Sequence, residues 1–184
     1  QEELVRIELA ARADASPEPV DLGRLRAGLD TLFGAAGDSR EEQQRLAAAV
    51  AVLRPVTVLA GGPGTGKTTT VAKILTLLRD RPGPPPRIAL AAPTGKAAAR
   101  LQEAVRPAGA GELAASTLHR LLGGRPGTAR FRHPRVDRLP YDVVVVDETS
   151  MVSLTMMARL LDAVRPDARL VLVGDPDQLA SVEA

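Results

Sequence analysis

The stretch Gly61-Gly62-Pro63-Gly64-Thr65-Gly66-Lys67-Thr68 follows a β-rich run at residues 56–60 and opens a helix-like segment at residues 67–78. It matches the pattern G-x-x-x-x-G-K-[S/T] in full. Glycines allow backbone N–H groups to approach phosphate oxygens, and the N-terminus of the following helix attracts an anion. The octet therefore predicts a phosphate-binding loop. A chance glycine turn before a helix is the alternative, and the strand, the helix and the complete octet disfavour it.

Two side chains of this loop have specific expected roles. The Lys67 ammonium reaches the β- and γ-phosphates of ATP, and the Thr68 hydroxyl is a ligand of Mg²⁺. Both roles require a nucleoside triphosphate with its bound metal ion. The predicted cofactors are therefore ATP and Mg²⁺.

A second polar site follows the continuous apolar run at residues 143–146, Val-Val-Val-Val, which is typical of a strand buried on both faces. Asp147 and Glu148 come directly after it. Open α/β sheets bind ligands at the carboxyl ends of their strands. There Asp147 can hold Mg²⁺ and Glu148 can polarise the water that attacks the γ-phosphate. A polar strand end is the alternative that we would favour without the phosphate loop.

Another apolar run, at residues 170–173, leads into Gly174-Asp175-Pro176-Asp177-Gln178. The Gln178 amide can donate to a phosphate oxygen and accept from a water molecule, so it is a candidate sensor of the γ-phosphate. By itself this stretch also reads as a simple turn.

The order of these segments predicts the fold class. Apolar runs at 56–60, 88–92, 143–146 and 170–173 alternate with helical patterns at 67–78, 96–105 and 154–164, which indicates an α/β fold with a parallel sheet and flanking helices. Ser39 and Glu42 form a capping-box pattern that opens a further helix. We expect residues 1–37 to be a helical appendage and residues 38–184 to be the P-loop domain.

Composition excludes several classes of function. The 184 residues contain no cysteine, so disulfides, thiolate zinc sites and cysteine nucleophiles are excluded. Phe33, Phe131 and Tyr141 are the only aromatic residues, so base stacking on aromatic side chains has few candidates. No apolar run is long enough to span a bilayer, and the N-terminus does not have the pattern of a signal peptide. We expect no membrane partner and a cytoplasmic location.

Taken together, six ordered stretches resemble the motifs of superfamily 1 helicases, in particular the RecD family, the alpha subunit of bacterial exodeoxyribonuclease V. The resemblance extends from about residue 40 to the end and implies a RecA-like P-loop domain. The stretches are Gln44–Val50 (the adenine-reading Q motif), 61–69 (motif I), 91–98 (Ia), 117–123 (Ib), 147–151 (II) and 174–179 (III).

This resemblance implies an enzyme, an ATP-dependent helicase that moves 5′ to 3′ on single-stranded DNA and acts with the beta and gamma subunits in double-strand break repair and recombination. A stand-alone RecD-like helicase and a nucleotide-dependent switch are alternatives, and a scaffold with a dead site is a third. The implied catalytic residues are Lys67, Glu148 and Gln178. The implied nucleotide-binding residues are Gln44, Gly61, Gly62, Pro63, Gly64, Thr65, Gly66, Lys67, Thr68 and Thr69, with Thr68 and Asp147 at the metal.

By the same resemblance, DNA contacts fall to Pro93, Thr94, Lys96, Thr117 and His119. Hydroxyls and N–H groups at helix starts suit phosphate contacts. Thr94 and Thr117 can also be simple helix N-caps, and both roles are compatible. His119, between leucines, can equally be a structural residue.

The segment 123–140 carries five arginines and one acidic residue, Asp137. Attraction to DNA phosphates and a solvated surface loop are the two interpretations of this charge. Helicases of this superfamily hydrolyse ATP between two RecA-like domains, and the motifs of the second are absent from this chain. We therefore expect the 184 residues alone to bind ATP and hydrolyse it weakly.

Overall fold

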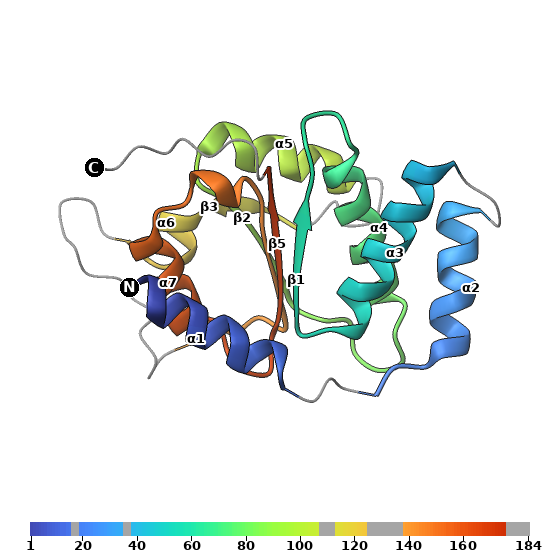
Figure 1. The fold of residues 1–184 in the computed structure, drawn as a ribbon, viewed down its shortest axis with the longest axis horizontal. Helices are drawn as coiled ribbons and strands as arrows, with labels where there is room; N and C mark the ends of the chain where they lie inside the picture. The colour runs from blue at the N-terminus through green and yellow to red at the C-terminus, as the bar shows by residue number, and fades with distance from the viewer. Residues whose placement is uncertain (16–18, 35–37, 107–112, 125–137, 176–184) are drawn as a thin grey trace.

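The computed structural model describes residues 1–15, 19–34, 38–106, 113–124 and 138–175. Within these ranges five parallel strands form one sheet in the order β1-β5-β4-β2-β3 (Figure 1). The predicted α/β class and parallel sheet are confirmed. The strands are β1 (Val56–Ala60), β2 (Ile88–Ala92), β3 (Ala115–Thr117), β4 (Val143–Val146) and β5 (Arg169–Gly174).

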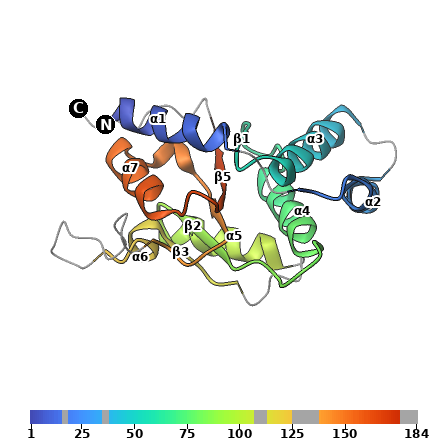
Figure 2. The same ribbon diagram turned by 90° about the horizontal axis from the view of Figure 1, so that it is seen from below.

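Helices cover both faces of this sheet (Figures 1 and 2). On one face lie α3, α4 and α5, with α2 outside them against α3 and α4; on the other lie α1, α6 and α7. The helices are α1 (Glu2–Ala13), α2 (Leu22–Phe33), α3 (Ser39–Leu53), α4 (Lys67–Arg79), α5 (Gly95–Val105), α6 (Leu118–Leu121) and α7 (Leu154–Ala163), with a 3-10 turn, η2 (Thr149–Met151).

The two layers of helices explain the all-valine strand. Val143 and Val145 lie in the core cluster beneath α3, α4 and α5, whereas Val144 and Val146 lie in the cluster beneath α6 and α7. All four side chains are at most 3% exposed. A central parallel strand has no solvent face, so its sequence is apolar throughout rather than alternating.

Helix α3 begins differently from the capping-box prediction, which was wrong by one residue. Asp38 is the N-cap, and its carboxylate accepts hydrogen bonds from the backbone N–H groups of Arg40 and Glu41. Ser39 is the first helical residue. A carboxylate at the N-cap accepts hydrogen bonds from the free N–H groups and also interacts favourably with the helix dipole. Asp38 is therefore favoured over Ser39 as the N-cap.

The N-terminal helices contact the sheet domain in different ways. In α2, Leu25, Leu29 and Phe33 are buried in the core cluster of α3 and α4. In α1, the contact with α7 includes the buried guanidinium of Arg12. A domain boundary at residue 37 stays a prediction, while both helices contact the sheet domain closely.

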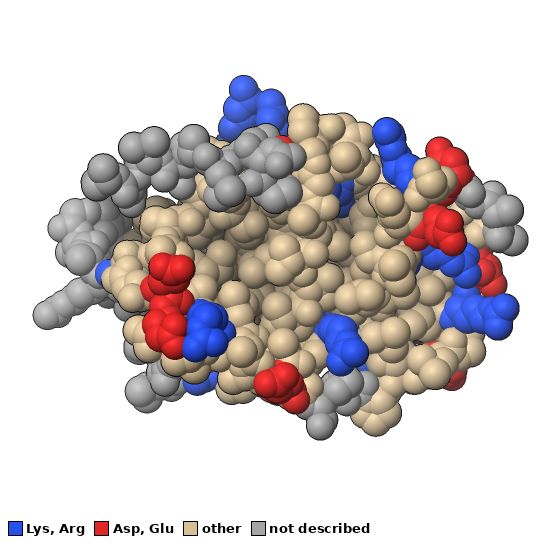
Figure 3. Space-filling model, viewed as in Figure 1, with Lys and Arg blue, Asp and Glu red and all other residues tan. Residues whose placement is uncertain are grey.

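Strand β1 is an edge strand of the described sheet, and its Val58 side chain is 62% exposed. Figure 3 shows the face of the molecule that includes this strand. Charged side chains lie mainly toward the margins of this face, and uncharged residues cover its centre (Figure 3). Among the described helices, none combines the length and apolar character needed to cross a bilayer.

Candidate functional site

The described candidate residues that follow strands all lie at one edge of the sheet. In a parallel sheet, every strand ends at the same edge, and the loops that follow the strands meet there. The phosphate loop follows β1, Asp175 follows β5 and Asp147 follows β4. Continuing along the sheet order, Pro93 follows β2 and Leu118 follows β3. The nucleotide candidates therefore lie toward the β1 end of this edge and the DNA candidates toward the β3 end.

The phosphate loop has the backbone shape that its glycines predict. Gly64 and Gly66 have φ values of 74° and 80°, in the left-handed region that favours glycine. A Cβ atom added at Gly62 or Gly64 would meet no heavy atom within 4 Å, so the backbone there is open to a ligand. Gly66 is also the N-cap of α4, whose first turn follows directly.

Gln44 comes from α3 and reaches this loop across the fold. Its Nε2 donates to the carbonyl oxygen of Thr65 at 2.8 Å. A Cβ atom at Gly66 would meet the same nitrogen, so a larger residue there would displace the Gln44 amide, and the φ of Gly66 also favours glycine. The structure thus brings Gln44 to the phosphate loop, and its role beside the adenine stays a prediction.

Lys67 is the first residue of α4 and is half-buried. Its Nζ donates to the carbonyl oxygens of Gly61 and Gly62, the latter at 2.7 Å. Thr65 Oγ1 donates to the same Gly62 oxygen at 2.9 Å. The ammonium therefore lies directly over the loop. Thr68 is half-buried and Thr69 is exposed on the same first turn of α4.

Asp147 is near this lysine. Burial raises the pKa of the Asp147 carboxyl above its ordinary value, whereas the hydrogen bond from the Glu148 backbone N–H and the positive charge of Lys67 act in the opposite direction. That hydrogen bond, from Glu148 N to Asp147 Oδ1, is 2.8 Å long. A nearby cation favours the charged form of a half-buried carboxyl, so a bound metal ion would lower the pKa of Asp147 further.

These residues fit a magnesium nucleotide. The open backbone at Gly62 and Gly64 and the ammonium of Lys67 suit phosphate oxygens, and the Thr68 hydroxyl and Asp147 carboxylate could supply oxygen ligands. Mg²⁺ is usually bound through one or two carboxylates together with waters and substrate phosphates, which suits these two groups. No cluster of three or more His, Cys, Asp or Glu residues that could hold a metal occurs in the described ranges.

Glu148 has an unusual backbone conformation, with φ 52° and ψ 42°. Among the described residues other than glycine, it alone has a positive φ. Such a conformation costs about 1–3 kcal/mol for a residue with a β-carbon and often occurs at functional sites. Nothing in the sequence pattern predicts it, because the left-handed region is associated with Gly, Asn and Asp rather than with Glu.

Thr149 and Gly174 lie within the stretches that resemble motifs II and III, but sequence reasoning assigned neither residue a role of its own. Thr149 Oγ1 donates to the carbonyl oxygen of Val173 at 2.9 Å, and a Cβ atom at Gly174 would lie 2.6 Å from that hydroxyl oxygen. The contact joins the end of β4 to the end of β5. The only signal that could have indicated it is the hydroxyl directly after the acidic pair.

The DNA candidates also come together. Ala92 of β2 pairs with Thr117 of β3, so the segment at 93–96 lies beside the segment at 117–119. The caps predicted as an alternative are present: Thr94 Oγ1 accepts from Ala97 N at 3.2 Å, and Thr117 Oγ1 accepts from Arg120 N at 3.3 Å. Lys96 and His119 are exposed, and Pro93 is half-buried.

Two other candidates fall wholly or mostly outside the described residues. Gln178 is one, so its expected place near the γ-phosphate stays a prediction. The arginine-rich segment is the other, apart from Arg138, which donates to the Val164 carbonyl oxygen at 3.3 Å.

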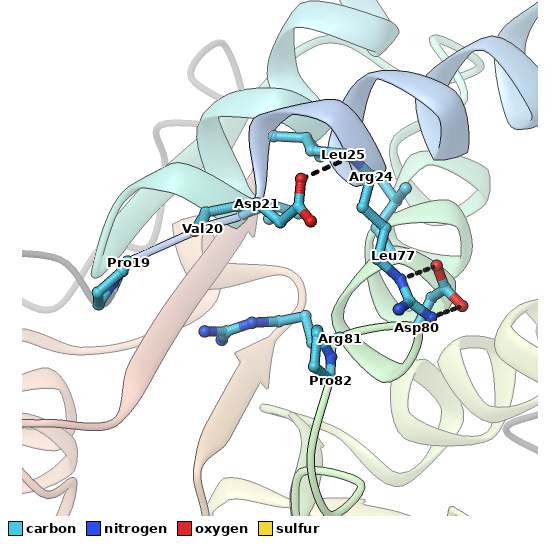
Figure 4. A pocket seen from close by; sticks show the side chains of 10 residues that line it. Pro19, Val20, Asp21, Arg24, Leu25, Leu77, Asp80, Arg81 and Pro82 are labelled. Atoms are coloured by element: carbon cyan, nitrogen blue, oxygen red, sulfur yellow. Dashed lines mark hydrogen bonds and ion pairs between the residues drawn. The ribbon is translucent and has the colours of Figure 1, made fainter.

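Two cavities, of about 250 and 390 Å³, lie apart from the phosphate loop. The smaller one is formed where α2 begins and α4 ends, beside the Arg24–Asp80 ion pair (Figure 4). The larger one includes Asp142 and Arg169 near the amino ends of β4 and β5. Neither is lined by a candidate site residue. The carboxyl edge remains the candidate site, because a phosphate group is held by loop N–H groups and does not need an apolar cavity.

A parallel sheet with a glycine loop between β1 and α4 and an acidic pair after β4 defines a P-loop nucleotide-binding domain. A family model described as "AAA domain" matches residues 44–184, and the chain belongs to this family.

Curated relatives are similar over most of the chain. The RecBCD enzyme subunit RecD of Mycolicibacterium smegmatis is 65% identical over 171 residues, which cover 83% of this chain and 30% of the relative. The ATP-dependent RecD2 DNA helicase of Deinococcus radiodurans is 47% identical over 127 residues, which cover 69% of this chain and 16% of the relative. The chain thus spans less than a third of the length of these relatives.

Among solved structures, the chain is similar to one described as "Structural Basis for DNA Unwinding at Forked dsDNA by two coordinating Pif1 helicases". The identity is 24% and the TM-score is 0.48, with 81% of this chain and 35% of the other covered. A TM-score at this level carries no argument about function.

Proposed function

We propose that this chain is the ATP-binding motor domain of a RecD-like DNA helicase that moves 5′ to 3′ on single-stranded DNA. The observation that carries the proposal is the carboxyl edge of the sheet, where the phosphate loop and the acidic pair lie together. The 65% identity to a RecD subunit supports the choice of this class over other P-loop proteins.

Within this proposal, Lys67 binds the β- and γ-phosphates and Gln44 lies beside the adenine. Thr68 and Asp147 hold Mg²⁺, which neutralises charge on the phosphates when it is bound. Glu148 orients and polarises the attacking water, and Gln178 contacts the γ-phosphate. The short distances from Lys67 to its loop and the charge interaction between Lys67 and Asp147 support this assignment.

DNA binding is the second part of the proposal. Pro93, Thr94 and Lys96 with Thr117 and His119 contact the phosphates of a single strand, which the pairing of β2 with β3 supports by placing the two segments side by side. Beta and gamma subunits of exodeoxyribonuclease V are the proposed partners, in double-strand break repair. The similarity to RecD2 favours a stand-alone helicase as the second candidate. The cytoplasmic location expected from the sequence belongs to the same proposal.

Lys67→Ala tests the nucleotide site. Loss of a charge-assisted contact should weaken binding of a fluorescent ATP analogue about 10- to 100-fold. Lys73→Ala is a matched control on the same helix, because Lys73 lies over the Phe33 ring with 3.9 Å between its Nζ and the ring centroid. If neither the natural protein nor Lys67→Ala binds the analogue, the chain is a scaffold with a dead nucleotide site, and if both bind it equally, Lys67 does not contact the phosphates.

Single-stranded DNA then separates the helicase from the switch. In a motor domain, bound DNA changes the affinity for nucleotide, and bound nucleotide changes the affinity for DNA by the same factor. We expect oligonucleotide addition to shift the affinity for the ATP analogue, and the shift to be reduced in Lys96→Ala. Nucleotide affinity that is insensitive to DNA would support the nucleotide-dependent switch instead.

A further inference from the structure

The last hydrogen bond between the β4 and β5 sides of the sheet is donated by a side-chain hydroxyl and not by a backbone N–H group. Gly174 O accepts from Gly61 N, on the β1 side, at 3.3 Å. Successive carbonyls of a strand face opposite neighbours, so Val173 O faces the β4 side. A continued β4 would supply its next donor from residue 148, but Glu148 N donates to Asp147 Oδ1 instead. The Thr149 hydroxyl fills the vacant position, at 2.9 Å from Val173 O.

The same hydroxyl lies directly after the strained residue. Glu148 has φ 52° and ψ 42°, and η2 begins at Thr149. A left-handed glutamate persists only when its surroundings fix it on both sides. On one side the Asp147 carboxylate accepts from the Glu148 N–H. On the other, the Thr149 side chain is tied to β5.

Gly174 leaves room for this arrangement. A Cβ atom there would lie 2.6 Å from Thr149 Oγ1, closer than such atoms approach. A methyl group there would force the hydroxyl or the neighbouring backbone to shift, which would disturb the bond to Val173 O. A glycine at the end of β5 therefore favours this hydrogen bond, even though Gly174 has no positive φ.

We propose that Thr149 is a positioning residue for the acidic pair. Its hydroxyl bond to Val173 O holds Glu148 in the left-handed conformation and fixes the acidic pair relative to the end of β5. The inference rests on the proposed function only where it concerns hydrolysis. Its structural part, the conformation of Glu148, stands independently.

Three variants test it. Thr149→Val removes the hydroxyl and keeps the shape, Thr149→Ser keeps the hydroxyl, and Gly174→Ala displaces the hydroxyl without altering residue 149. Thr76→Val is the matched control, because Thr76 Oγ1 also donates to a backbone carbonyl, that of Ala72 at 3.1 Å, near the far end of α4. The readouts are crystal structures, nucleotide affinity and the single-turnover rate of ATP hydrolysis.

In Thr149→Val and Gly174→Ala, we expect Glu148 to leave the left-handed region and single-turnover hydrolysis to slow about 10- to 100-fold, as misplacement of a catalytic group does. Nucleotide affinity should stay within about twofold, because the loss concerns the reaction and not ground-state binding. Thr149→Ser and Thr76→Val should match the natural protein in all three readouts.

A left-handed Glu148 in the Thr149→Val crystal structure would overturn the inference, whatever the rates. If Glu148 moves in the Thr149→Val structure but the natural protein does not bind ATP, the inference about position stands and the proposed function as an ATP-binding motor domain fails. If Thr149→Val only lowers the melting temperature and keeps the natural rate, Thr149 is structural and not a positioning residue.

Discussion

At the scale of single residues, two left-handed positions at the site have different origins. Gly66 is left-handed because the loop turns there and because the Gln44 amide occupies the space of a side chain. Glu148 is left-handed although it carries a side chain, and its conformation depends on hydrogen bonds on both sides. The conformation of Gly66 needs only the absence of a side chain. The conformation of Glu148 depends on hydrogen bonds that single substitutions can remove.

Asp142 gives a pH prediction at the same scale. Burial raises the pKa of its carboxyl, but hydrogen bonds from Arg87 and Arg165 outweigh this effect and lower the pKa from 3.8 to about 2. A lowered pKa in the folded state means that the stabilisation is complete above the unfolded value and is lost as the pH falls from about 4 to about 2.

We therefore expect Asp142→Asn to be less stable than the natural protein at pH 6 and to approach it near pH 2. The Asp142 side chain is 36% exposed, so solvent screening keeps the difference at pH 6 to about 1 kcal/mol. Urea unfolding at a series of pH values measures it. A difference that stays constant between pH 6 and pH 2 would contradict the assigned ion pairs.

At the scale of elements, hydrogen bonds from Arg12 connect α1 to the C-terminal end of α7. Its guanidinium, 5% exposed, donates to the carbonyl oxygens of Leu161 at 2.9 Å, Val164 at 2.6 Å and Arg165 at 2.8 Å. Leu161 lies in the last turn of α7, and Val164 and Arg165 follow the helix directly, so Arg12 caps the end of α7, where carbonyls lack helical partners. A cation there also complements the helix dipole.

Arg12→Met should lower the free energy of unfolding by about 2–4 kcal/mol, because it removes three hydrogen bonds, two of them to buried carbonyl oxygens. Arg6→Met is the control on the same helix, since Arg6 is exposed and forms an ion pair with Glu3 on the helix surface. Chemical denaturation of both variants is the measurement. Similar losses in the two variants would show that α1 contributes little through this contact.

Some of the strands and helix contacts could be predicted from the sequence and others could not. Runs 56–60, 88–92 and 143–146 are strands with the predicted ends, because each apolar run is limited by proline, glycine or charge. Strand β3 was not predicted, because Ala-Ser-Thr has no apolar pattern and becomes a strand only by pairing with β2. The Arg12 contact was likewise beyond prediction, because the sequence gives no sign that a charged residue of α1 is buried.

The candidate site also has features that the sequence predicts and features that it does not. Glycines, Lys67 and the acidic pair were predictable, because phosphate and metal chemistry restricts the residue types and their spacing. The Thr149–Val173 hydrogen bond and the conformation of Glu148 were not, because they arise where two strands of unequal length end side by side.

At the scale of the whole molecule, the arginine-rich segment is the remaining candidate for DNA attraction. Arg138 donates to Val164 O, so it has a structural contact and should be left intact. Replacing the other four, Arg125, Arg130, Arg132 and Arg135, by serine should reduce the slope of log affinity for single-stranded DNA against log salt by ~3 if all four contact phosphates.

A matched charge control replaces Arg6, Arg24, Arg26 and Arg54, all exposed and on α1, α2 or the turn before β1. Those changes should alter the slope little, because screening limits distant charges. If both sets of four give the same slope as the natural protein, the segment is a solvated loop and not part of the DNA footprint.

The sheet order places the strand that ends at Asp147 directly beside the strand that leads to the DNA candidates. Asp147 N donates to Ala91 O at 2.9 Å, and Ala91 precedes Pro93 by only two residues. The backbone of the proposed metal ligand Asp147 is therefore one hydrogen bond from the strand that leads to the DNA candidates. We expect a shift of β4 on the nucleotide side to move the segment at 93–96 without any hinge, through this hydrogen bond between neighbouring strands.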